Sequence, residues 1–200
     1  MSVAVLPFFV MQRSIFTKER CNKAYAVPEY CLSKFIVSLP GVFVIALVPS
    51  LLIVFPALLN GFGVYLATLF LALLVAEAFM ALIASLVPHY IVGIALAAGL
   101  FGFFMLCCGF FIVKDDIPPY LIWGFYLAPH TYIFRLFMYN EFEPINNFNS
   151  AQFEDGDAVL EYYSMENTNV GANMGILVLY IAVFQLLFAG VLQKWHTGLR

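Results

Sequence analysis

The sequence predicts an all-α membrane protein, a polytopic bundle of helices, on three observations. Of its 200 residues, 64% are hydrophobic and 10% are charged, whereas a soluble domain is typically about 45–50% apolar and about 25% charged. The apolar residues gather into four long runs, and the basic residues lie mostly before the first run and after the last. Such a chain cannot cover its apolar surface with polar groups, so we expect lipid to be its solvent.

Each of the four runs is long enough to cross a hydrocarbon layer of about 30 Å as an α-helix, which rises about 1.5 Å per residue. Backbone groups cannot stay unpaired in lipid, so the runs are predicted to be helices. Pro40 and Pro49 lie inside the first run and predict a kink there. The predicted spans are residues 35–55, 64–87, 90–113 and 174–193.

The charged residues predict the orientation. Residues 114–170 contain two basic side chains, Lys114 and Arg135, against nine acidic ones. The positive-inside rule therefore places residues 12–34 and the C-terminus in the cytoplasm and the acidic stretch outside. Four crossings return the chain to its starting side, in agreement with the charges.

The N-terminus predicts a truncated helix. Residues 3–11 are apolar but would reach only about 13 Å as a helix, and they lack the basic start of a signal peptide. We interpret residues 1–12 as the inner end of a span whose outer part is missing, so that the chain is a fragment of a larger protein.

Residues 118–142, "PPYLIWGFYLAPHTYIFRLFMYNEF", fit neither a span nor a loop in water. They are rich in aromatic and aliphatic side chains but contain three prolines, a histidine and an arginine. The prolines predict a division into short helices, which at membrane depth is tolerated only against protein. The alternative is an amphipathic helix that lies on the outer surface.

Three stretches carry a resemblance to a known family. "IFTKERCNKAYAVPEYCLSKFIVSLP", "CGFFIVKDDIPPYLIWGFYLAPHTYIFRLFMYNEF" and the last span with its short basic tail resemble ABC transporter subfamily G, the white/breast-cancer-resistance/pleiotropic-drug-resistance type. The resemblance covers nearly all of the chain. It implies the C-terminal part of an ABC-2 type transmembrane domain, a type V exporter-like helical bundle, without its nucleotide-binding domain.

The resemblance also assigns roles to the two stretches between spans. It implies that residues 114–173 form an external segment whose residues 118–140 are a re-entrant helix pair. It implies that residues 13–34 form a cytoplasmic segment that couples to the nucleotide-binding domain. The alternative for the latter is a plain topology signal, since the charges would look the same. The expected coupling residues are Lys18, Glu19, Arg20 and Lys23.

The third span has an apolar stripe at helical spacings of three and four, which would line a slot for flat, apolar or amphipathic molecules. The resemblance implies that this helix carries substrate-contacting residues and an apolar plug, with the plug at Phe110 and Phe111, just after Gly109. Ordinary helix packing is the alternative for the stripe. Its members are Leu100, Phe101, Phe104, Met105 and Cys108.

Glu77 is the one charged residue inside its span. An ionisable group there costs a few kcal/mol and normally faces a partner or water. It could contact substrate, relay a proton, or hydrogen-bond a neighbouring helix.

The sequence has no P-loop and no ABC signature motif, so this chain alone is not expected to hydrolyse ATP. ATP and Mg²⁺ are implied for the missing nucleotide-binding domain, and we expect no cofactor on this chain. His89, His130 and His196 are too dispersed to predict a metal site, and no catalytic set of side chains is evident.

We therefore expect the transmembrane domain of an ATP-driven ABC exporter for lipid-like or amphipathic small molecules. Its expected partners are membrane lipid, the nucleotide-binding domain, a second transporter half as homo- or heterodimer, and the substrate, with no nucleic acid. We expect it in the plasma membrane. The alternative is a truncated, non-transporting subunit that pairs with or regulates full-length transporters.

Overall fold

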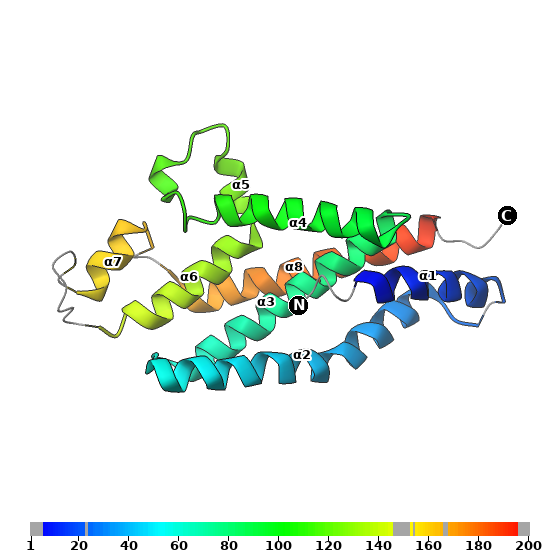
Figure 1. Cartoon of the computed structure of the whole chain (residues 1–200), viewed down its shortest axis with the longest axis horizontal. Helices are drawn as coiled ribbons and strands as arrows, with labels where there is room; N and C mark the ends of the chain where they lie inside the picture. Colours follow the sequence, from blue (N-terminus) through cyan, green and yellow to red (C-terminus); the bar gives the residue numbers. More distant parts are fainter. Residues whose placement is uncertain (1–5, 23, 146–152, 154, 166–167, 196–200) are drawn as a thin grey trace. The chain divides into compact units, whose positions relative to one another are not determined.

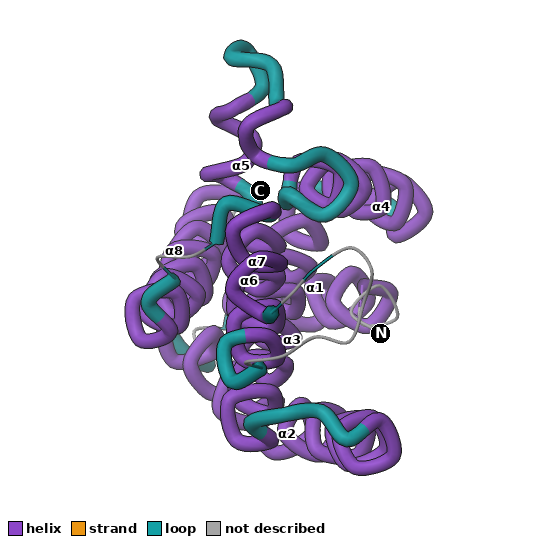
Figure 2. The backbone as a smooth tube through the Cα atoms, turned by 90° about the vertical axis from the view of Figure 1, so that its left-hand side faces the viewer, coloured by secondary structure: helices purple, strands orange, loops and turns teal. Residues whose placement is uncertain are grey.

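The computed structural model describes residues 6–22, 24–145, 153, 155–165 and 168–195. All regular structure within these residues is helical, which confirms the all-α prediction (Figures 1 and 2). The elements in chain order are α1 (Leu6–Cys21), α2 (Val27–Ala57), α3 (Phe62–Leu86), α4 (Tyr90–Cys107), the 3₁₀ turn η2 (Lys114–Asp116), α5 (Ile122–Leu127), α6 (Pro129–Phe142), α7 (Gly156–Tyr162) and α8 (Val170–Trp195).

Four of the described helices, α2, α3, α4 and α8, are long and apolar enough to cross a membrane. They coincide with the four predicted runs, but their ends differ from the predicted ones. Helix α2 begins at Val27, so its polar first turns are helical as well, and α4 already ends at Cys107. The early end of α4 has a backbone cause. Gly109 has φ +92°, a left-handed conformation that glycine adopts readily and that stops a helix.

Polar side chains cap the N-terminal ends of α2 and α7. The Glu29 carboxylate accepts the backbone N–H of Ala26 at 3.1 Å, ahead of α2. Asp155 is the N-cap of α7 and accepts the N–H of Ala158 at 2.8 Å. Each contact satisfies one of the N–H groups that a helix start leaves without a partner.

The proline-rich stretch forms two short helices. Ala128 is extended (φ −76°, ψ 120°) and Pro129 is the first residue of α6, as is typical of a residue before proline and of proline at a helix start. The buried Thr131 hydroxyl donates to the Phe125 carbonyl at 2.7 Å and ties α6 back to α5. The predicted division into short helices is therefore present, and their depth in a membrane stays a prediction.

The chain divides into two compact units. One comprises Met1–Phe43, Leu73–Leu100 and Leu179–Arg200, and the other comprises Val44–Ala72 and Phe101–Val178. The boundary cuts through the four long helices, so each unit contains one part of every candidate span. The two units are described separately below.

Candidate functional site

In the first unit, Arg13 of α1 closes the C-terminal end of α3. Its guanidinium donates to the carbonyl oxygens of Ala84, Val87 and Pro88 at 3.2, 2.6 and 3.3 Å. The last carbonyls of a helix have no partner within it, and a cation there is also favoured by the helix dipole. The Arg13 side chain thus supplies hydrogen-bond donors to the carbonyl groups at the end of one candidate span and attaches α1 to it.

Arg20 makes the equivalent contact with α8. Its guanidinium donates to the carbonyl oxygens of Leu192 at 2.7 Å and Gln193 at 3.3 Å. Arg20 follows Arg13 by seven residues, which is about two helical turns, so both arginines lie on one side of α1. Helix α1 is therefore attached to the C-terminal ends of two candidate spans.

The other predicted coupling residues lie in different surroundings. Lys18 is exposed on α1. The Glu19 carboxylate accepts a hydrogen bond from the Tyr25 hydroxyl, and Tyr25 in turn stacks on Tyr30 with ring centroids 5.7 Å apart. Burial and the bond to Glu19 raise the pKa of Tyr25. Lys23 lies outside the described residues.

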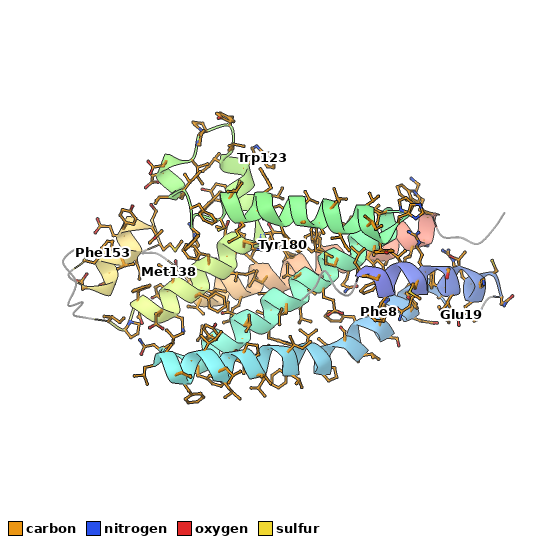
Figure 3. The ribbon with its side chains drawn as sticks, in the orientation of Figure 1. Phe8, Glu19, Trp123, Met138, Phe153 and Tyr180 are labelled. Carbon is orange, nitrogen blue, oxygen red and sulfur yellow. The ribbon has the colours of Figure 1, made fainter. Side chains whose placement is uncertain are left out.

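Glu77 lies at a cavity of about 570 Å³ between α1, α2 and α3. Lys34 lines the same cavity, where its ammonium donates to the Gln12 side chain and lies 3.5 Å from the centre of the Phe9 ring. The Glu77 Oε2 atom is buried and has no hydrogen-bond partner among the residues that the structure describes. Figure 3 labels Phe8 and Glu19, which line the same cavity from α1. The polar lining residues are Gln12, Glu19, Ser33, Lys34, Ser38 and Glu77.

If Glu77 takes part in transport, Glu77→Gln should lower the transport rate and change its pH dependence, because glutamine keeps the shape of the side chain but cannot ionise. The measurement is substrate uptake into vesicles across a pH series, in a transporter that includes this chain and its ATPase domain. Unchanged uptake and an unchanged pH profile would leave Glu77 a structural residue only.

The predicted stripe on α4 separates into buried and exposed members. In the second unit, the Phe101 and Phe104 rings lie 5.6 and 6.2 Å from the His130 ring of α6, and Phe104 is buried. Cys108 is buried too, and its thiol donates to the Met105 carbonyl at 3.0 Å. The Met105 side chain is exposed, and Leu100, in the first unit, is half-buried. Two aromatic members thus pack on α6, and substrate contact stays a prediction for the stripe.

The predicted plug residues follow the end of α4. Phe110 and Phe111 are exposed, with their ring centroids 4.9 Å apart. Phe110 also meets Phe134 of α6 edge-on at 5.5 Å. A Cβ at Gly109 would lie 3.1 Å from the Phe125 ring, so the glycine brings this bend close to α5. The gating role of the pair stays a prediction.

Together these features define a polytopic helical membrane domain with a short charged helix attached to the ends of its spans. The profile of the family described as "ABC-2 type transporter" matches residues 1–142. The chain therefore belongs to the ABC-2 type transporter family.

Its relatives are G-family ABC transporters, as the resemblance predicts. "ABC transporter G family member STR2" of Medicago truncatula is 27% identical over 196 residues, which is 94% of this chain and 26% of that protein. "ABC transporter G family member STR" of the same plant is 34% identical over 142 residues, 69% of this chain and 17% of that protein. "ABC transporter G family member 8" of Arabidopsis thaliana is 30% identical over 141 residues, which is 68% of this chain and 24% of that protein. The chain thus spans no more than about a quarter of the length of these relatives.

Three contributors to these sites are not singled out by the sequence. In the sequence, Arg13 and Lys34 are only two of the basic residues that predict the orientation, and nothing in the pattern around Gln12 indicates a site. The helical spacing of Arg13 and Arg20 is visible, but their carbonyl partners lie 71 or more positions away along the chain.

Proposed function

We propose that this chain is the transmembrane part of an ATP-driven exporter of lipid-like or amphipathic small molecules, and that it works as a dimer with a second transporter half in the plasma membrane. Its membership of the ABC-2 family and its G-family relatives support the proposal. ATP and Mg²⁺ would be bound by a nucleotide-binding domain, which supplies the energy of hydrolysis. The substrate-contacting stripe and the plug keep their predicted roles in this proposal.

The observation that carries the proposal is the attachment of α1. A short helix that Arg13 and Arg20 hydrogen-bond to the ends of α3 and α8 would move with both spans. The exposed Lys18 is then available to an acidic surface of the nucleotide-binding domain. A displacement of that domain would pass through α1 to the spans, which is what coupling requires.

The test is Lys18→Glu in vesicles that hold this chain joined to a nucleotide-binding domain. We expect ATP-driven uptake of a fluorescent amphiphile to fall by about tenfold, since energetic coupling between two sites is typically worth a factor of about 5–150. Uptake and ATP hydrolysis are measured on the same vesicles.

Glu143→Lys is the matched control, because it also reverses an exposed charge but lies beyond α6. Equal effects of the two substitutions would contradict the coupling role of Lys18. A lack of ATP-dependent uptake by the unsubstituted protein would contradict the exporter itself and favour a subunit that does not transport.

A further inference from the structure

In the second unit, the turn between α2 and α3 is tied to the end of α6 by three hydrogen bonds. The Asn60 N–H donates to the Glu141 carboxylate at 2.9 Å, and the Asn60 side-chain amide donates to the Glu141 carbonyl at 3.3 Å. The Asn140 amide donates to the Asn60 carbonyl at 2.8 Å. Both backbone groups of Asn60 are thus used in a contact across 80 or 81 positions of sequence. We call Asn60, Asn140 and Glu141 the turn clip.

The backbone next to the turn clip is shaped for this close approach. Gly61 has φ +59°, and a Cβ at that position would lie 2.1 Å from the Asn140 side-chain oxygen. Glycine adopts this conformation readily, and while Asn140 is present a side chain at position 61 would meet its oxygen. Leu58 also has a positive φ, +52°, which is uncommon for a bulky residue; it directly follows α2, where a left-handed residue commonly ends a helix.

The contact continues along both helices. One turn into α3, the Tyr65 ring lies 4.8 Å from the ring of Phe137, one turn back along α6. Beyond the end of α6, the Gly156 N–H donates to the Ile145 carbonyl at 2.9 Å. The C-terminal end of α6 is thus held by the α2–α3 turn and by the start of α7.

We propose that the turn clip makes α6 and the α2–α3 turn one mechanical unit, so that α6 keeps its position on α3 while the transporter changes conformation. Asn60, Asn140 and Glu141 are positioning residues, which act on α6 and not on substrate. The clip itself does not depend on the proposed function, but its consequence for transport does.

The first test is amide hydrogen exchange of the protein in nanodiscs. Asn140→Asp keeps the size of the side chain but replaces the N–H₂ donor by an oxygen that faces the Asn60 carbonyl. We expect exchange in residues 58–62 and 137–142 to become faster together, by about fivefold, which corresponds to the free energy of a typical net hydrogen bond. Glu141→Gln keeps an oxygen acceptor and should change exchange much less, and Glu143→Gln, two residues on, should change nothing.

Faster exchange in residues 58–62 alone, with residues 137–142 unchanged, would overturn the proposal, because the turn and α6 would then move independently. The same holds if Asn140→Asp and Glu143→Gln behave alike.

A cysteine pair tests the clip during transport and does not depend on the folding of Asn140→Asp. Gly61→Cys with Asn140→Cys removes the oxygen that a Cβ at position 61 would meet, and that Cβ lies 2.9 Å from the Asn140 Cγ position. Asn140→Cys alone, in a Cys21→Ser background, is the control, since Gly61→Cys alone would place a Cβ 2.1 Å from the Asn140 oxygen. We expect ATP-driven uptake to persist when the disulfide is formed, because the disulfide then links the turn to α6 in place of the Asn140 hydrogen bond. Uptake that stops on oxidation and returns with reductant would show that the clip must open, which overturns the proposal.

If the unsubstituted protein shows no ATP-driven uptake, the proposed function fails while the exchange measurements still decide the clip.

Discussion

Arg13→Ala is expected to lower the free energy of unfolding by about 1.5–3 kcal/mol, the range for losing hydrogen bonds to a charged group. The half-buried guanidinium serves three carbonyl oxygens at the end of α3, and alanine would leave these acceptors without their donor. The favourable placement of a cation at a helix C-terminus is lost as well. Thermal unfolding in nanodiscs measures the effect.

Two further variants separate capping from charge. Arg13→Lys keeps the positive charge but has no planar fork of donors, so it should recover part of the stability. Lys18→Ala removes a charge from the exposed side of the same helix and should stay within about 0.5 kcal/mol of the unsubstituted protein. If Arg13→Ala and Lys18→Ala are equally mild, Arg13 does not fasten α1 to α3.

Gly156→Ala is the second substitution with a large expected effect, a loss of about 3 kcal/mol. The added Cβ would lie 1.9 Å from the Phe142 carbonyl oxygen and 3.0 Å from that of Ile145. These are backbone atoms, which cannot turn aside as a side chain could, so α7 must move off the end of α6. Hydrogen exchange in residues 156–162 reports this displacement locally.

Helix propensity alone predicts the opposite sign. Alanine in a helix is favoured over glycine by about 1 kcal/mol, and Gly175→Ala in α8 has that benefit with no atom within 4 Å of its Cβ. The two substitutions should therefore move stability in opposite directions. A stabilised Gly156→Ala protein would mean that α7 does not pack on α6 as described.

The four spans could be predicted because hydropathy and length are properties of the sequence alone. Their ends were less predictable. The apolar run of the third span continues to residue 113, while α4 ends at Cys107 because of the left-handed Gly109. Hydropathy reports side chains and says nothing of backbone conformation. Residues 27–34 include charged side chains, so hydropathy left them out of the predicted span. They are nevertheless helical in α2, because polar turns outside lipid can extend a helix at little cost.

The candidate sites were predictable in part. The charged segment, Glu77 and the aromatic stripe stand out as unusual residues in their local sequence. Their partners do not, because Arg13 meets carbonyls of α3 and Lys34 shares a cavity with Glu77 only once separate helices pack together. Asn60 and Asn140 likewise look like ordinary turn and helix-end residues until the structure joins them.

The central claim of the account is that residues 118–142 face the opposite side of the membrane from α1, as the charge distribution predicts. Labelling intact cells with a membrane-impermeant thiol reagent tests it most directly. Cys21 is an exposed native thiol on α1, and the other three cysteines are buried. Tyr120→Cys, in a Cys21→Ser background, adds a thiol at a side chain that is 74% exposed.

We expect the thiol introduced at position 120 to be labelled in intact cells. In the unsubstituted protein, Cys21 should be labelled only after the cells are opened. Labelling of both thiols in intact cells, or the reverse order, would contradict the topology and the exporter proposal with it.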